Sequence, residues 1–155
     1  MLVPAAIEAV VERAGNIAAL SPKGARGVWQ FMPDAARRYR LVVTADHDER
    51  IEVAKSTRAA ARYLRDLYQR FGDWRVAFAA YNAGEQAVER AVTRTGHWDF
   101  SQIEPSLPAE TRHHVPAVMN AMELLGSNKQ EISAGVKSGR SPARSVLYAS
   151  TESLE

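Results

Sequence analysis

The sequence predicts a mostly α protein. Apolar residues recur at helical spacing in several stretches, the longest of them from Val53 to Phe71. Strand-like alternation is confined to the brief segment 41–44, which we assign to a loop. The 155 residues, with 46% hydrophobic and 25% charged side chains, have the size and composition of a single soluble domain.

The N-terminal part alternates one helix, one loop and a second helix. Pro4 suits a first helical turn, and the helix ends near Gly15, so Glu12 lies at its C-terminal end. Turn-forming residues are dense over 16–28, which predicts an ordered loop that forms a cleft wall. A short helix is expected to begin at about Trp29.

The middle of the chain predicts three consecutive helices. The helix over 53–71 is ended by Gly72, and Asp73 caps the next helix. A third helix runs from about Glu85 to Arg94. The second helix is expected to bury the face formed by Trp74, Ala77, Phe78 and Tyr81.

A last apolar stripe follows Pro108 and ends near Leu125. From Gly126 onward the composition turns to Ser, Gly, Lys and Arg, which is typical of a tail. We therefore predict a folded catalytic domain over residues 1–125 and a flexible C-terminal tail over 126–155.

Composition narrows the classes of function. A net charge of +2 with interspersed signs argues against nucleic acid as a partner. The absence of cysteine excludes disulfides and thiolate ligands, and the four histidines lack metal-ligand spacing, so we predict neither metal nor cofactor. No apolar run approaches the ~18 residues of a membrane span, and the N-terminus does not resemble a secretion signal.

Glu12 is the first candidate for chemistry. A carboxyl at the end of an apolar helix, facing an irregular loop, can lie against nonpolar walls, which raise its pKa and keep it protonated as a general acid. A glutamate at a helix end is more often simply solvated. The surrounding motifs decide between the two interpretations.

Four segments occur in a characteristic order. They are Glu12 with the residues up to Asn16, the loop from Ser21 to Gln30, residues 80–84 (Ala-Tyr-Asn-Ala-Gly), and residues 107–112 with Val115 beyond them. Together they closely resemble the soluble lytic transglycosylase family, which has a goose-lysozyme-like fold, over roughly residues 3–125. The resemblance implies a lysozyme-like helical domain whose ordered loop forms a glycan cleft.

The resemblance implies a lyase of the bacterial cell wall that acts on peptidoglycan (murein). It would cleave the β-1,4 bond between N-acetylmuramic acid and N-acetylglucosamine and leave 1,6-anhydromuramyl ends. Glu12 would protonate the leaving oxygen and then deprotonate the C6 hydroxyl, so one carboxyl serves as acid and base. The implied location is the periplasm or cell envelope, with glycan strands, and in some settings envelope machinery, as partners.

The same resemblance implies the residues that line the cleft. They are Ser21, Gln30, Tyr81, Asn82 and His114. Trp29 is the tryptophan expected to stack on a sugar ring, whereas Trp74 and Trp98 are expected in the core. Tyr81 and Asn82 could equally lock the loop to the helices as buried polar groups.

The sequence departs from the family pattern in ways that leave alternatives open. Arg13 follows Glu12 where the family has serine, and a guanidinium there would favour the ionised glutamate. His114 replaces a tyrosine, and little chain precedes the first helix. The alternatives are a catalytically impaired peptidoglycan-docking module and a goose-type lysozyme hydrolase, the latter with a water-activating carboxylate in the loop after Ser21 or near Asp46.

Overall fold

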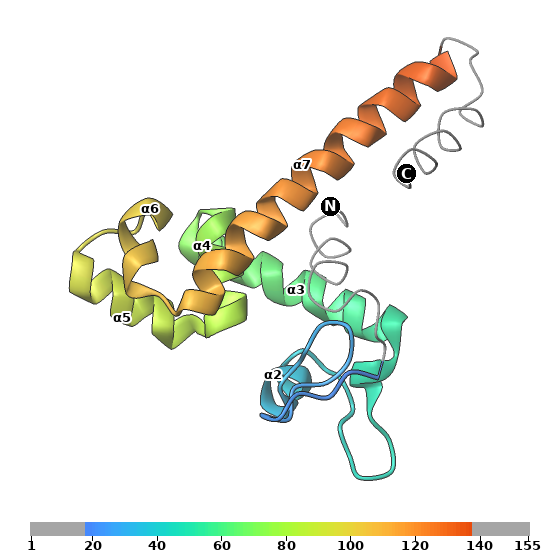
Figure 1. Ribbon diagram of the computed structural model, residues 1–155. Coiled ribbons are helices and arrows are strands. Elements are labelled where there is room, and N and C mark those ends of the chain that lie inside the picture. The colour runs from blue at the N-terminus through green and yellow to red at the C-terminus, as the bar shows by residue number, and fades with distance from the viewer. Residues whose placement is uncertain (1–17, 138–155) are drawn as a thin grey trace, which may run out of the picture. The chain divides into compact units, whose positions relative to one another are not determined.

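The computed structural model describes residues 18–137, with side-chain environments through residue 123 (Figure 1). The chain divides into two units after Met122, and the fold described here is that of the first. Over the described residues it is helical with isolated β-bridges and no strand, which confirms the mostly α class. The elements are α2 (Pro33–Arg38), η1 (Glu49–Ile51), α3 (Val53–Phe71), α4 (Trp74–Ala83), α5 (Glu85–Thr95), α6 (Phe100–Ile103), η2 (Glu104–Ser106) and α7 (Ala109–Lys137).

Both ends of α3 and the start of α4 lie where the sequence predicts. Gly72 ends α3 in the left-handed conformation, with φ 74°. Asp73 caps α4, because its side chain accepts a hydrogen bond from the backbone N–H of Arg75 at 2.7 Å. The αL glycine and the N-cap aspartate are separate signals at adjacent positions, so the turn between the two helices is tightly specified.

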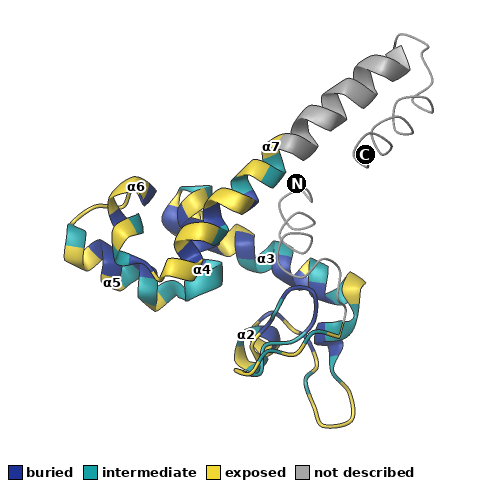
Figure 2. Cartoon of the chain, in the orientation of Figure 1, coloured by how far each residue is buried: buried dark blue, intermediate teal, exposed yellow. Residues whose placement is uncertain are grey.

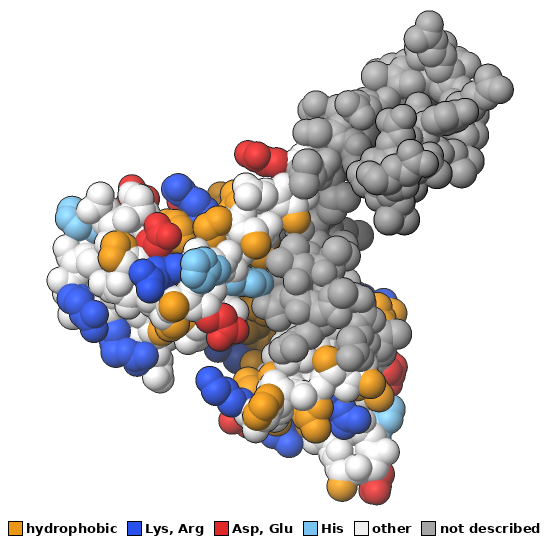
Figure 3. All heavy atoms as spheres, in the orientation of Figure 1, with side chains coloured by type: hydrophobic (Ala, Val, Ile, Leu, Met, Phe, Trp, Pro, Cys, Tyr) orange, Lys and Arg blue, Asp and Glu red, His pale blue; other side chains and the backbone are white. Residues whose placement is uncertain are grey.

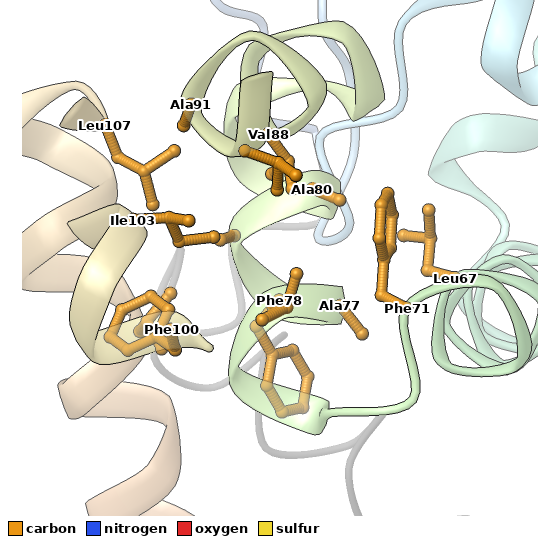
Figure 4. Close-up of a cluster of buried hydrophobic side chains, with 14 of the residues drawn as sticks. Leu67, Phe71, Ala77, Phe78, Ala80, Val88, Ala91, Phe100, Ile103 and Leu107 are labelled. Atoms are coloured by element: carbon orange, nitrogen blue, oxygen red, sulfur yellow. The ribbon is translucent and has the colours of Figure 1, made fainter. Parts of the chain in front are cut away.

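A large apolar cluster joins α3 to α7. Five consecutive residues of α4, from Val76 to Ala80, are fully buried, and three of them are alanines that let neighbouring helices approach closely. Side chains from α3, α5 and α6 converge on this helix (Figure 4). Of the predicted buried face, Ala77 and Phe78 are buried, whereas Trp74 and Tyr81 are half-buried. Figure 2 shows buried stretches along α3, α4 and α5.

A second apolar cluster holds the loop before α2 against α3. Its buried members are Val28, Trp29, Phe31, Ala36, Tyr39, Leu41, Ala59 and Ala60. The helix expected from Trp29 begins instead at Pro33, because residues 27–30 form a turn in which Gln30 has a φ of 48°. A positive φ at a non-glycine residue is incompatible with a right-handed helix, so the helix starts only after this turn.

Two tryptophans differ from expectation. The prediction that Trp98 is a core residue is wrong, since it is 57% exposed. Trp74 is half-buried and stacks on Tyr68 of α3, with ring centroids 4.3 Å apart. The Trp74 ring thus packs between the surface and the core rather than within it.

Some predictions lie outside the described residues or stay untested. The first predicted helix, with Glu12 and Arg13, lies outside them. The assignment of residues 1–125 to a catalytic domain and 126–155 to a tail stays a prediction, and α7 continues to Lys137. No helix in the described part of the chain is long and apolar enough to cross a membrane.

A buried arginine organises the loop that precedes α2. Arg50 is 6% exposed, and its Nη1 donates hydrogen bonds to the carbonyl oxygens of Gly24 at 2.8 Å and Phe31 at 3.0 Å. Its guanidinium also contacts Asp48, with Nη2 2.8 Å from Oδ2. The Arg50 guanidinium therefore links both ends of the 24–31 segment to the turn before α3.

Asp48 makes this arrangement sensitive to acid. Hydrogen bonds from Arg50 lower the pKa of Asp48 to about 2, and its side chain is only 9% exposed. A carboxyl whose pKa is lower in the folded state contributes stability above its unfolded pKa and loses it as pH falls through the folded value. We expect Asp48→Asn to cost about 2 kcal/mol in the free energy of unfolding at neutral pH, and the difference from wild type to shrink as pH approaches 2.

Urea unfolding of wild type and Asp48→Asn across this pH range checks the expectation. Asp34→Asn is the matched control, because the Asp34 side chain is fully exposed and pairs with Arg37 on the same helix. It should change stability by less than about 0.5 kcal/mol at every pH. A constant difference between Asp48→Asn and wild type from neutral pH to pH 2 would contradict the role given to Asp48.

Candidate functional site

The end of α4 is bonded directly to the turn at residues 27–30. The Tyr81 hydroxyl donates a hydrogen bond to the backbone carbonyl of Trp29 at 2.9 Å, across 52 residues of sequence. The Tyr81 ring also meets Phe31 edge-on, with centroids 6.3 Å apart, and packs on Tyr63 at 5.1 Å. The second and third predicted motifs are therefore neighbours in the structure.

The side chain of Gln30 forms hydrogen bonds within its own loop. Its Nε2 donates to the carbonyls of Gly27 at 2.8 Å and Ala19 at 3.3 Å, while its backbone adopts a left-handed conformation. Such conformations in non-glycine residues persist where the surroundings impose them, and they are concentrated at functional sites. The amide nitrogen of Gln30 is thus engaged by the backbone of its own loop.

Ser21 lies in the same loop and closes a tight turn. Its Oγ accepts from the backbone N–H of Ala25 at 3.0 Å, and its own N–H donates to the Ala25 carbonyl at 2.8 Å. The place of Ser21 in a shared site with Gln30, Tyr81, Asn82 and His114 stays a prediction.

Asn82 is bonded to the start of α7. The hydroxyl of Thr111 lies 2.7 Å from Asn82 Oδ1, and Thr111 is 1% exposed. His114 follows Thr111 by three residues on the same helix, so the two share a helix face. This bond brings the third motif next to the fourth, and places Asn82 and half-buried His114 in one neighbourhood.

Trp29 is corrected from a cleft residue to a core residue. Its side chain is 1% exposed, and its indole Nε1–H donates to Thr57 Oγ1 of α3 at 2.9 Å. A ring buried on both faces does not offer the open face that stacking on a sugar requires. Trp29 instead contributes its backbone carbonyl, which receives the Tyr81 hydroxyl.

Tyr63 of α3 packs against Tyr81. It stacks on Tyr39, with ring centroids 4.7 Å apart, and contacts the Tyr81 ring at an interplanar angle of 46°, and burial raises the pKa of its phenol. A phenol kept neutral in this way is an apolar support for the neighbouring Tyr81 ring. The aromatic group thus fixes the side chain that joins α4 to the loop.

One group of side chains has the composition of a cation site. His47 Nε2 lies 3.3 Å from Glu52 Oε1 and 3.8 Å from Glu49 Oε1. The Lys55 ammonium already lies between the two carboxylates, 2.6 Å from Glu49 and 2.9 Å from Glu52, and its hydrogen bond lowers the pKa of Glu49. The group is therefore an ion-pair cluster, and a metal ion would have to displace a lysine.

The charged side chains visible in Figure 3 do not single out a further binding site. In the view of Figure 3, basic and acidic side chains are interspersed over the described surface. A shallow hollow along α5 is lined by Gln86, Glu89, Arg90, Thr93 and Arg94, none of which the motifs select. The amide, phenol and imidazole groups around Tyr81 and Asn82 remain the best-supported binding surface, and Glu12 lies outside the described residues.

Sequence reasoning missed two residues. Thr111 lies inside the fourth motif, and its place opposite Asn82 depends on how α4 and α7 pack. Nothing in the sequence around Arg50 indicates its role, because an arginine between Glu49 and Ile51 is ordinary until folding buries it beneath the loop. A buried arginine can be recognised only through the carbonyl groups that surround it.

Comparison with known proteins gives consistent results. The family model described as "Transglycosylase SLT domain" matches residues 5–103. The membrane-bound lytic murein transglycosylase D of Escherichia coli K12 is 36% identical over 126 residues, which cover 78% of this chain and 27% of that protein. The soluble lytic murein transglycosylase of Salmonella typhimurium LT2 is 33% identical over 115 residues, 70% of this chain and 18% of that protein.

The fold is also that of a solved enzyme. The crystal structure of the 70 kDa soluble lytic transglycosylase of Escherichia coli matches with a TM-score of 0.67 and 27% identity, over 77% of this chain and 21% of that chain. The chain therefore spans about a quarter or less of the length of these relatives. The lysozyme-like helical fold expected from the sequence is confirmed.

Proposed function

Because the chain belongs to the transglycosylase SLT domain family, we propose that it is a peptidoglycan lytic transglycosylase. The proposed reaction cleaves the β-1,4 bond between N-acetylmuramic acid and N-acetylglucosamine and forms 1,6-anhydromuramyl ends. No water is added, since the C6 hydroxyl of the muramic acid attacks its own anomeric carbon. Peptidoglycan glycan strands are the substrate, and the cell envelope or periplasm is the location.

Glu12 is the proposed catalytic residue. Its protonated carboxyl gives a proton to the leaving glycosidic oxygen, and the substrate's acetamido group stabilises the positive charge at the anomeric carbon. The carboxylate then takes the proton of the C6 hydroxyl as the anhydro ring closes. The chemistry needs one carboxyl in two successive roles, whereas ordinary glycosidases need two carboxyls.

The observation that best supports the proposal is the hydrogen bond from Tyr81 to the Trp29 carbonyl. It joins the Ala-Tyr-Asn-Ala-Gly segment to the Gly27–Gln30 turn, two motifs that are far apart in sequence. The bond between Thr111 and Asn82 joins the same segment to the fourth motif. Segments selected for their resemblance to one family are thus joined by hydrogen bonds, and Gln30, Asn82 and His114 are the proposed substrate ligands.

The goose-type hydrolase has less support from the loop. Asp48 is held by Arg50 and Arg26, with Arg26 Nη1 3.1 Å from Oδ2, and its lowered pKa makes it a weak base for activating water. Asp34 is fully exposed on α2 and pairs with Arg37. Neither carboxylate has the environment of a catalytic base.

The docking module is favoured by one observation, the arginine directly after Glu12. Incubation of the purified chain with peptidoglycan sacculi separates the two proposals. The enzyme is expected to release soluble muropeptides with time, and sacculus binding without release would favour docking. Arg13→Ser is the informative variant, because an enzyme restrained by the guanidinium should gain activity, whereas a docking module lacking a working site should stay inactive.

A further inference from the structure

We propose that Thr111 is a positioning residue that fixes the side-chain amide of Asn82, so that Asn82 donates a hydrogen bond to the carbonyl oxygen of an N-acetyl group. The inference rests on the proposed function in its choice of ligand, an N-acetylated glycan. Its structural part concerns two side chains alone. The contact between them joins α4 to the first turns of α7.

The bond has a defined direction. A threonine hydroxyl carries one proton, and a carbonyl oxygen only accepts, so Thr111 Oγ1 is the donor and Asn82 Oδ1 the acceptor at 2.7 Å. Helical threonines commonly turn this proton back to a carbonyl of the preceding turn, as Thr95 does toward Ala91 at 3.0 Å. The hydroxyl of Thr111 donates instead to a side chain 29 residues away.

Burial makes the arrangement selective. Thr111 is 1% exposed, so if the Asn82 amide turned its nitrogen toward Oγ1, the hydroxyl proton would lose its acceptor and would need another one inside the core. The bond therefore holds the amide in one of its two orientations. Asn82 is itself half-buried, and the hydrogen bond of its side chain within the described residues is made by Oδ1 rather than by Nδ2.

An amide held in this way offers N–H groups rather than an acceptor. A sugar hydroxyl both donates and accepts, and would bind either orientation of the amide. An N-acetyl carbonyl only accepts, so it gains from an amide whose N–H groups are fixed toward it, whereas a sugar hydroxyl does not distinguish the two orientations. The sugars of peptidoglycan carry acetamido groups, which makes their carbonyl oxygen the ligand that this geometry fits.

The test combines glycan binding with the dynamics of the Asn82 side chain, using the full chain. Calorimetry with tetramers of N-acetylglucosamine is expected to show binding weakened about fivefold to tenfold by Thr111→Val. Thr111→Ser, which keeps the hydroxyl, should restore it. Thr95→Val is the matched control, since it removes a hydroxyl that bonds only near its own helix end.

A double-variant cycle separates positioning from general destabilisation. If Thr111 acts through Asn82, then Thr111→Val in an Asn82→Ala background should weaken binding no further. Independent, multiplicative losses would overturn the proposal, as would unchanged binding in Thr111→Val. All variants are compared at a temperature at which each is fully folded.

Nuclear magnetic resonance of the Asn82 side-chain NH₂ tests the positioning without any glycan. The group should be rigid in wild type and Thr111→Ser, and mobile in Thr111→Val. Equal mobility in all three overturns the positioning role. Rigid behaviour in wild type, lost in Thr111→Val, but without binding of the tetramer would instead overturn the choice of ligand and count against the proposed function.

Discussion

Glu12→Gln is expected to abolish the release of muropeptides from sacculi, with a loss of at least about a hundredfold. The amide keeps the shape of the carboxyl but neither gives nor takes a proton at the glycosidic and C6 oxygens. Binding to sacculi should persist, because the proposed substrate ligands Gln30, Asn82 and His114 are untouched. Release of soluble muropeptides with time, together with sedimentation of bound protein, measures both properties.

Glu8→Gln is the matched control, since Glu8 lies one turn earlier in the same predicted helix. It should leave release and binding near the wild-type level. Retained activity in Glu12→Gln would show that another group performs the proton transfers. A loss of activity in both variants would indicate that the helix, rather than one carboxyl, had been disturbed.

Gly27→Ala is expected to destabilise the loop that carries Gln30 by about 3 kcal/mol or more. Gly27 has a φ of 84°, and a Cβ there would lie 2.1 Å from the backbone carbonyl oxygen of Arg50. The obstacle is backbone held by the Arg50 guanidinium contacts, so it cannot move aside as a flexible side chain would. Urea unfolding measures the loss, and activity should fall with it because Gln30 is displaced.

Gly24→Ala separates the clash from the backbone conformation. Gly24 has a φ of 89°, but a Cβ there would meet nothing within 4 Å. This variant should lower the free energy of unfolding by about 1 kcal/mol, the cost of placing an alanine in the left-handed conformation. Equal stability of Gly27→Ala and Gly24→Ala would contradict the account of how the loop packs on Arg50.

The features that the sequence predicted best are helix ends, which depend on residues close together in the chain. Both ends of α3 and the Asp73 cap of α4 follow from local signals, an apolar periodicity closed by a glycine and an aspartate placed to accept an N–H. The turn-rich loop was also predictable from its glycines. The start of α2 could not be predicted, because Gln30 adopts a left-handed conformation that its residue type does not indicate.

The rest of the site depends on contacts between distant residues. Trp29, expected in the cleft, is buried, and Trp98, expected in the core, is exposed. The few apolar residues around a tryptophan do not distinguish a buried ring from an exposed one. The motifs selected Tyr81 and Asn82 but not their partners, the Trp29 carbonyl and the Thr111 hydroxyl. Such pairs are set by the packing of α4 against the loop and α7, which periodicity along one helix does not encode.

The most direct test of the proposed reaction is to digest sacculi in water labelled with heavy oxygen and analyse the released muropeptides by mass spectrometry. The account predicts unlabelled products that are lighter by one water, because the muramic acid closes on its own C6 hydroxyl. Reducing ends that carry the label would contradict it, since they would require water as the nucleophile.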